Sequence, residues 1–179
     1  MRIKKISIIG NSCSGKTTVA RQLAKVFSLP LHHSDSIQYL PGLKWREPSE
    51  TRRILSEISQ HEEWIIDGLG PLKILEERMQ RADLVVVLRP SLPTLYWRFF
   101  KRQIKGLFLR REELPENCFE ATPAHTIRMI KTIWNVHFGF WKQMDRILKT
   151  DDYRNKVIST KYIGEIQILV SAFCKEKLN

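Results

Sequence analysis

The feature that most constrains this chain is a glycine-rich run directly after a short apolar segment. Residues 6–9 read Ile-Ser-Ile-Ile, and residues 10–17 read Gly-Asn-Ser-Cys-Ser-Gly-Lys-Thr. The apolar segment is rich in β-branched residues and ends at Gly10, as expected of a buried strand. Apolar residues then recur at helical spacing as far as residue 29. A strand, a glycine-rich turn and a helix in this order are the context in which a G-x-x-x-x-G-K-[ST] motif binds phosphate.

The run therefore predicts a phosphate-binding loop, or P-loop. Backbone N–H groups turn inward around a phosphate in such a loop, and the helix behind it adds its positive end. Gly10 and Gly15 supply the backbone freedom for the turn. Lys16 can reach the β- and γ-phosphates, and the Thr17 hydroxyl can ligate Mg²⁺, so we expect ATP and Mg²⁺ as cofactors. The expected nucleotide contacts in the loop are Gly10, Asn11, Ser12, Cys13, Ser14, Gly15, Lys16, Thr17 and Thr18.

Apolar periodicity places this loop in an α/β fold. Residues 84–88, Leu-Val-Val-Val-Leu, form a continuous apolar run, which is typical of a parallel strand covered on both faces. Strands that alternate with helices imply an α/β P-loop NTPase fold, a mostly parallel five-stranded sheet with helices on both faces. Residues 36–48, rich in Pro, Gly and aromatics, are predicted to be a loop. The other predicted strands are 6–9, 31–34, 64–68 and 157–158, and the predicted helices are about 15–29, 49–61, 71–80, 90–105, 127–148 and 163–173.

Length and pattern indicate one domain. The 179 residues fit a single P-loop kinase-like domain over 1–179. Residues 106–123 break the helical pattern, so we expect a lid-like insertion there. Residues 127–148 then predict one long amphipathic helix, bent at Gly139, whose apolar stripe packs into the core. The stripe comprises Ile127, Ile130, Trp134, His137, Trp141, Met144 and Leu148.

Charge and cysteine usage narrow the partners and the compartment. Thirty Lys and Arg against nineteen Asp and Glu leave a net charge of +11, which indicates either anionic partners or a basic surface without a partner. The three cysteines lie far apart, so we expect no disulfide framework and no zinc site, and a reducing compartment. No run approaches the roughly 20 apolar residues of a membrane span. We expect a cytoplasmic protein with no membrane partner.

A P-loop needs a second acid near Mg²⁺, and Asp67 is the best candidate. It follows the predicted strand residues Trp64-Ile65-Ile66, and an acid at a strand end can meet the water shell of the metal. The alternative is a turn aspartate before Gly68. Asp83 competes weakly, because it precedes its strand and so lies at the opposite edge of a parallel sheet.

Basic residues on the helix after residue 88 could contact phosphates. Four of them, at spacings of three and four, form one helix face: Arg98, Lys101, Arg102 and Lys105. Arg110 and Arg111 follow in the lid-like insertion. Phosphoryl transfer needs cations around the migrating group. We therefore predict Arg98 and Arg102 as nucleotide contacts, and Arg102 and Arg110 as catalytic residues beside Lys16. A solvated basic face is the alternative.

The acceptor side is predicted around Asp35. This residue stands at the end of the second predicted strand, on the same edge as the P-loop. As a fourth catalytic residue it could orient an acceptor hydroxyl or accept its proton; capping the following segment is the alternative. Trp45 could stack on an acceptor ring or plug the core. The acceptor, a small molecule or a nucleotide, is not identified by the sequence.

Several elements resemble known small P-loop kinases. Ile65-Ile66-Asp67-Gly68 resembles the strand end of nucleoside monophosphate kinases, and Arg98-x-x-x-Arg102 the phosphate-contacting arginine pair of adenylate kinases. His33-Ser34-Asp35 is similar to the Asp-Ser-Asp element of shikimate kinases, with His33 in place of the first acid. The resemblance is closest to the adenylate-kinase-like DNA topology modulation proteins and implies a monophosphate-kinase-like fold with a lid. It rests on Asp35 and on residues 41–45, 64–68 and 110–116.

Two classes of function remain open. The first is a kinase that moves the γ-phosphoryl group of ATP to a small hydroxyl or phosphate acceptor, such as a nucleoside, a nucleotide or a nucleic-acid end. The second is an ATP-dependent, nucleic-acid-binding NTPase that affects DNA topology and phosphorylates no acceptor. We favour the first and expect any nucleic-acid binding to be weak and indifferent to sequence, because no known nucleic-acid-binding motif is present. Residues 68–71 lack the arginine of an adenylate-type turn, which weakens the case for an AMP-like acceptor.

A GTPase is less favoured still. Residues 67–70 fit the Asp-x-x-Gly pattern of a GTPase switch. Residues 155–158 resemble a guanine-reading Asn-Lys-x-Asp, but Ile158 stands where the acid must be. Without that acid the guanine edge has no acceptor.

Overall fold

The computed structural model of the chain describes residues 3–106, 115, 118 and 122–178. Its centre is a five-stranded sheet in the order β2-β5-β1-β6-β7, and all four neighbouring pairs are parallel. The predicted parallel sheet is therefore confirmed. Its strands are β1 (Lys5–Gly10), β2 (Leu31–His33), β5 (Trp64–Asp67), β6 (Leu84–Leu88) and β7 (Val157–Thr160).

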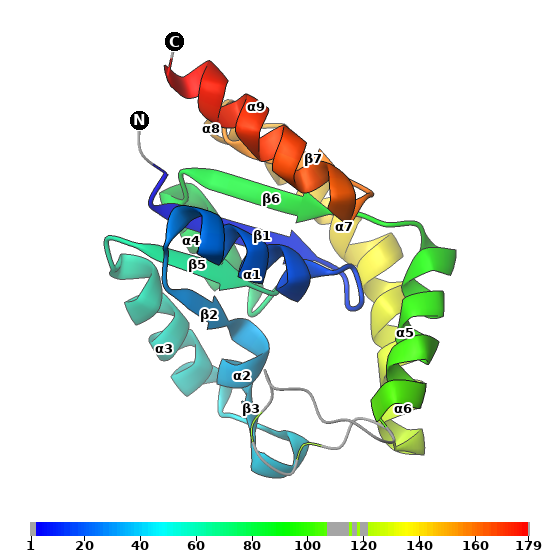
Figure 1. Cartoon of the computed structure of the whole chain (residues 1–179). Helices are drawn as coiled ribbons and strands as arrows, with labels where there is room; N and C mark the ends of the chain where they lie inside the picture. Colours follow the sequence, from blue (N-terminus) through cyan, green and yellow to red (C-terminus); the bar gives the residue numbers. More distant parts are fainter. Residues whose placement is uncertain (1–2, 107–114, 116–117, 119–121, 179) are drawn as a thin grey trace.

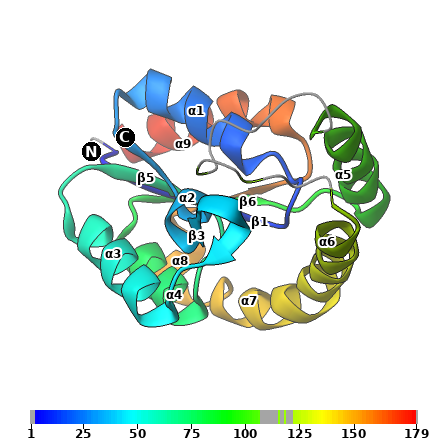
Figure 2. The same ribbon diagram turned by 90° about the horizontal axis from the view of Figure 1, so that it is seen from below.

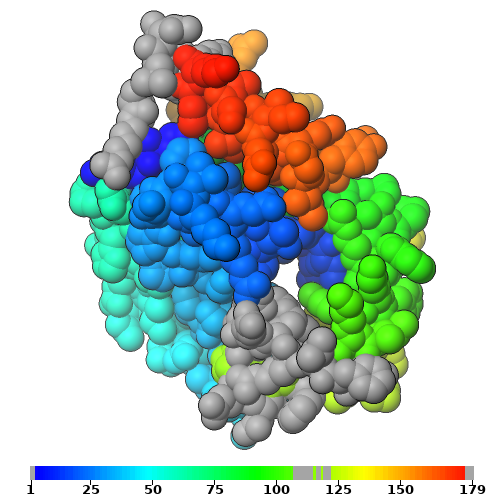
Figure 3. Space-filling view, viewed as in Figure 1, coloured from blue at the N-terminus to red at the C-terminus, as the bar shows by residue number. Residues whose placement is uncertain are grey.

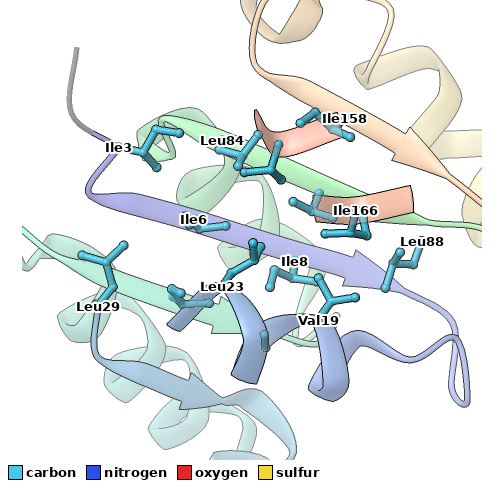
Figure 4. Close-up of a cluster of buried hydrophobic side chains, with 14 residues drawn as sticks. Ile3, Ile6, Ile8, Val19, Leu23, Leu29, Leu84, Leu88, Ile158 and Ile166 are labelled. Atoms are coloured by element: carbon cyan, nitrogen blue, oxygen red, sulfur yellow. The ribbon is translucent and has the colours of Figure 1, made fainter. Parts of the chain in front are cut away.

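Helices cover both faces of the sheet (Figures 1 and 2). On one face lie α1 (Lys16–Phe27) and α9 (Ile166–Leu178). On the other lie α3 (Pro48–Gln60), α4 (Leu72–Arg81), α7 (Trp141–Ile147) and the short α8 (Asp151–Arg154). The strand side chains alternate between two cores: Ile6 and Ile8 pack toward α1 (Figure 4), whereas Ile9 packs toward α4 and α7. This two-sided burial explains why the strands are apolar at nearly every position.

Two further helices form a hairpin beside the carboxyl ends of the strands (Figure 1). They are α5 (Leu92–Gly106) and α6 (Pro123–Asn135). Leu95 and Phe99 of α5 pack against Met129 and Ile133 of α6. Most of the predicted lid-like insertion, with Arg110 and Arg111, lies outside the described residues.

The predicted loop at 36–48 is wrong in detail, because it contains short regular elements. A one-turn helix, α2 (Ser34–Gln38), leads into the antiparallel pair β3 (Tyr39–Leu40) and β4 (Lys44–Trp45) around the 3-10 turn η1 (Pro41–Leu43). Elements of two to five residues are too short to show a period in the sequence.

The predicted long helix is interrupted by a π-helical turn, η2 (Val136–Phe140), which contains Gly139. Trp141 and Met144 are buried as predicted. Trp134 and Ile127 are not, with 53% and 57% of their surfaces exposed, so the predicted stripe is wrong at these two positions. Ile130, between them, does pack against the core of the α5–α6 pair. The π turn holds an extra residue per turn, and the buried face before it is therefore His125, Met129 and Ile133. No described helix is long and apolar enough to cross a membrane.

Candidate active site

The P-loop joins β1 to α1 and is held in shape by its own contacts. Asn11 is almost fully buried; its Nδ2 donates to the Ile133 carbonyl (2.8 Å) and its Oδ1 accepts from the Ser12 N–H (2.7 Å). Gly15 has a φ of 96°, in the left-handed region. A Cβ on Gly10 would lie 2.8 Å from the Leu88 carbonyl, so only glycine fits there. The loop is thus anchored to both β6 and α6.

Lys16 lies where the P-loop meets two cavities. Its Nζ donates to the Asn11 carbonyl at 2.8 Å. Its side chain lines a cavity of about 250 Å³ beside α5 and a second of about 180 Å³ beside α2. Ser12 lines both cavities as well, so the two spaces meet at the P-loop.

The first cavity carries the predicted phosphate contacts. It is lined by the loop residues from Ser12 to Thr18 except Ser14, and by Arg21, Arg98 and Arg102. Arg98 Nη1 donates to the Ser14 carbonyl at 3.1 Å. Lys101 and Lys105, which share a helix face with Arg98 and Arg102, do not line the cavity and are exposed. Figure 3 shows an opening between the blue P-loop segment and the green α5.

Next to Gly15 lies the 3-10 turn η3 (Ile163–Glu165), which follows β7. A Cβ on Gly15 would collide with the Ile163 side chain and lie 3.8 Å from Arg98 Nη1. Ile163 and Arg98 therefore approach the P-loop together. Neither Ile163 nor Arg21 belongs to a motif that the sequence could reveal.

A carboxylate site lies at the carboxyl ends of β2 and β5, beside the first turn of α1. Asp67 Oδ2 accepts a hydrogen bond from Thr17 Oγ1 (3.1 Å), and Asp67 Oδ1 lies 2.9 Å from His33 Nδ1. His33 and Asp67 are direct partners in the β2–β5 register. Burial alone would raise the pKa of Asp67, but the hydrogen bond and charge of His33, the charge of Lys16 and the Thr17 hydroxyl together lower it. The carboxylate is therefore ionised at neutral pH.

Arg78 lies beneath this site, and sequence reasoning missed it. Its side chain is fully buried, and Nη2 donates to the Gly68 carbonyl next to Asp67. Burial lowers the pKa of Arg78 to about 10, although the charge of Asp67 opposes the shift. An arginine at position 78 looked like any other charge in a polar helix, because the sequence does not show which residues lie under the turn at 68–70.

The second cavity contains the predicted acceptor residues. Asp35, in the first turn of α2, lines it together with Lys16 and Trp45. Asp35 Oδ1 is 3.9 Å from the position that a Cβ on Gly68 would take, so Asp35 lies beside the Asp67 strand end. Trp45 is 57% exposed and stacks obliquely on Tyr39, with 4.7 Å between ring centroids, so it does not plug the core. Arg128 of α6 also lines this cavity, a residue that the sequence did not single out.

The structure thus brings the predicted residues of the P-loop, Asp35, Asp67, Arg98 and Arg102 to one edge of the sheet. Asp83 lies at the other edge, where its carboxylate accepts the backbone N–H groups of Lys4 and Lys5. Arg110 lies outside the described residues. His137 is only half-buried and lines a separate cavity of about 630 Å³ behind the P-loop, which contains neither Asp35 nor Asp67.

Comparison with solved structures shows the same architecture in shikimate kinases. Shikimate kinase from Acinetobacter baumannii in complex with shikimate has a TM-score of 0.62 and 18% identity, over 99% of this chain and 96% of that one. This chain has the shikimate kinase fold. Shikimate kinase from Bacteroides thetaiotaomicron has a TM-score of 0.52 and 14% identity, over 98% and 96% of the two chains. An uncharacterized protein from Eubacterium ventriosum gives 0.52 and 14%, over 97% and 99%.

Sequence comparison adds no family. No protein-family model matches the chain, and no curated protein matches it. The structural likeness, at less than a fifth identity, establishes the P-loop kinase fold and leaves the reaction to be argued from the site itself.

Proposed function

We propose that this protein is an ATP-dependent phosphotransferase that moves the γ-phosphoryl group of ATP to a small hydroxyl or phosphate acceptor. The observation that carries the proposal is the position of Lys16 between two cavities, one lined by arginines and one by Asp35. An NTPase that only hydrolyses ATP needs water beside its P-loop, whereas a kinase needs a second pocket for the acceptor. The shikimate kinases with the same fold, one of them in complex with shikimate, support a small-molecule acceptor.

The first cavity would hold the nucleotide. Backbone N–H groups of the P-loop surround the phosphates, and Lys16 neutralises the β- and γ-phosphates. Arg98 and Arg102 lie on the other wall and add cations around the migrating group. Ile163 and Arg98, which flank Gly15, would contact the nucleoside end. Arg110, from the lid-like insertion, would supply a further positive charge to the migrating phosphoryl group.

Thr17 and Asp67 fit a Mg²⁺ site. Their oxygens are 3.1 Å apart, and the lowered pKa of Asp67 supplies an anionic ligand. The described residues contain no group of three or more His, Cys, Asp or Glu side chains that could enclose a metal. This agrees with Mg²⁺ chemistry, in which phosphate oxygens and water complete the coordination and the ion neutralises the phosphates. His33 fixes the orientation of the carboxylate from the other side.

The second cavity would hold the acceptor. In the transfer step the acceptor oxygen forms a bond to the γ-phosphorus, while the bond between this phosphorus and the β,γ-bridging oxygen breaks. Asp35 would orient the acceptor hydroxyl and take its proton. Trp45 offers a ring face to the acceptor, and Arg128 offers a cation for an anionic substituent.

A nucleic-acid-binding NTPase is the second candidate, favoured by the net charge of +11 and by the exposed Lys101 and Lys105. The resemblance to DNA topology modulation proteins points the same way, but it rests on sequence motifs alone. Phosphorylation of a polynucleotide end would combine both candidates. In either case the protein would act on ATP with Mg²⁺.

An acceptor screen separates the two candidates. Wild-type protein is incubated with γ-labelled ATP, Mg²⁺ and a panel of small alcohols, sugars, nucleosides, nucleotides and oligonucleotides, with Lys16→Ala as the inactive control. ADP release that rises with one acceptor, together with label in that acceptor, supports the kinase. ADP release that rises with nucleic acid while all label appears as inorganic phosphate would instead establish the NTPase.

A further inference from the structure

The α5–α6 hairpin has two sides with different chemistry. One side faces the candidate active site and carries Arg98 and Arg102 on α5 and Arg128 on α6, all of which line the two cavities. The helices contact each other through Leu95, Phe99, Met129 and Ile133. The side that faces away from the P-loop needs no contact with the substrates of the kinase.

That other side exposes large apolar side chains. Ten such side chains are exposed among the described residues, and six of them lie on this hairpin and the π turn that follows it. They form what we call the outer apolar patch: Trp97 (71% exposed), Phe100 (48%), Ile104 (63%), Ile127 (57%), Trp134 (53%) and Phe138 (53%). The rings of Trp134 and Phe138 contact each other at a tilt, with 4.5 Å between centroids. Clustered exposure on this scale is typical of an interaction surface.

Helix geometry places the two stripes on the same side. Consecutive residues of an α-helix are about 100° apart. Seen from the helix–helix contact, Trp97, Phe100 and Ile104 lie on the opposite flank of α5 from Arg98 and Arg102. On α6, Ile127 and Trp134 likewise lie on the opposite flank from Arg128. Because the arginine flanks of both helices face the P-loop, the apolar flanks of both helices share the outer side, where α5 and α6 run next to each other (Figures 1 and 2).

The charge around the patch has one sign. Residues 92–106 and 123–144 contain no Asp or Glu, and four Lys remain when the three arginines that face the active site are set aside. Of these, Lys131 lies one turn from both Ile127 and Trp134, on the outer side, and is exposed. A second copy docked symmetrically would place this basic surface against itself, and like charges across an interface oppose association. The occupant of the patch must therefore be both apolar and anionic.

We propose that the outer apolar patch docks on the surface of an anionic lipid bilayer. Basic helices with Trp, Phe and aliphatic residues on one face bind at the headgroup boundary, with the apolar side chains inserted and the lysines at the anionic headgroups. Tryptophan is itself enriched at this boundary. Nucleic acid would use the lysines and the rings, but it offers no apolar volume for Ile104 and Ile127. The chain would lie on the bilayer, and the predicted absence of a membrane partner would be wrong in this respect.

Vesicle flotation tests the proposal. Wild-type protein should float with vesicles of equimolar phosphatidylcholine and phosphatidylglycerol, bind much less to phosphatidylcholine alone, and be released by high salt. The double variant Trp97→Ser/Trp134→Ser should lose about tenfold or more in partitioning, since it removes two inserted rings. Trp45→Ser removes a tryptophan on β4 whose exposure (57%) lies between those of Trp97 and Trp134, and it should bind like wild type. Lys131→Glu should weaken binding about fivefold or more, whereas Lys25→Glu on α1 should not.

Circular dichroism and thermal unfolding of the same variants show whether they fold, which is expected because every substituted side chain is exposed. The proposal fails if wild-type protein does not bind the anionic vesicles, or if Trp45→Ser loses as much binding as the patch variant. It also fails if the patch variant loses only self-association in sedimentation, or only affinity for labelled single-stranded DNA. None of these results depends on kinase activity, so the lipid proposal and the proposed function stand or fall separately.

Discussion

Replacing Asp67 by asparagine removes the one charge that the proposed metal site depends on while it keeps the size of the side chain. In the structure the Asp67 carboxylate accepts a hydrogen bond from Thr17 at 3.1 Å and contacts His33 at 2.9 Å, with only 5% of its side chain exposed. Hydrogen bonds to a charged group contribute about 1.5–3 kcal/mol each. The asparagine side-chain oxygen can still accept one of these two hydrogen bonds. In the wild type, the cost of burying the carboxylate charge offsets part of the stabilisation that the two hydrogen bonds provide. We expect Asp67→Asn to lower the free energy of unfolding by about 1–3 kcal/mol.

The pH dependence follows from the lowered pKa of Asp67. A carboxyl whose pKa is lower in the folded than in the unfolded state stabilises the fold above its unfolded pKa. The stabilisation is lost as the pH falls through the folded value. The difference in unfolding free energy between wild type and Asp67→Asn should therefore be constant near neutrality and shrink below about pH 4.

Two assays check this reasoning. Urea unfolding from neutral pH to pH 3 measures the stability difference, and titration with ADP at varied Mg²⁺ measures the metal-dependent part of nucleotide affinity. Asp67→Asn should reduce the Mg²⁺-dependent gain in ADP affinity at least about tenfold, the range of a lost charge-assisted contact. Asp152→Asn, an exposed acid on α8, is the control and should change neither quantity. Wild-type Mg²⁺ dependence in Asp67→Asn would refute the assignment of the metal site.

Three further predictions concern the nucleotide cavity and the second strand. Lys16→Ala should abolish turnover and weaken binding of a fluorescent ATP analogue, and Thr17→Ala should mainly raise the Mg²⁺ requirement; unchanged affinity and turnover in Lys16→Ala would contradict the phosphate site. If Arg98 or Arg102 contacts the transition state, its replacement by Ala should lower turnover about 10³–10⁵-fold, with a much smaller loss in ATP affinity. A graded loss of DNA affinity with intact turnover in both variants would instead favour the NTPase. Burial, and then the charges of two neighbouring histidines, lower the pKa of His32, so the stability of the fold should fall as the pH drops through about 6.5. His32→Gln should flatten this fall, measured by thermal unfolding between pH 7 and pH 5. An unchanged slope would show that His32 is not the source of the pH dependence.

The sheet and the phosphate loop could be predicted because their sequence signals are local. The run at 84–88 is apolar at every position, since β6 is covered on both faces, and the P-loop motif fixes the strand–turn–helix order around Lys16. Asp35 and Asp67 could be placed on the same edge because the carboxyl ends of parallel strands meet there. These inferences need only the direction of each strand.

The features that were missed depend on packing between segments far apart in the chain. The π turn at 136–140 shifts the buried face of the helix before it, and nothing in the periodicity announces the extra residue, so Trp134 was predicted to be buried. Arg128 and Ile163 reach the site only because α6 and the turn after β7 fold back onto the P-loop. Arg78 is buried because α4 passes under the turn at 68–70. Each is a tertiary effect without a motif.

The measurement that tests the central claim most directly compares two activities of Asp35→Asn. Once an acceptor has been identified, its acceptor-dependent ADP release is measured beside the slow background hydrolysis of ATP, with Asp67→Asn in parallel. If Asp35 handles the acceptor, Asp35→Asn should lose about 10²–10⁴-fold in acceptor-dependent release and keep nucleotide binding and background hydrolysis near wild type, whereas Asp67→Asn should lose both activities. Equal loss of both activities in Asp35→Asn, or full acceptor-dependent turnover in that variant, would contradict a phosphotransferase with its acceptor at Asp35.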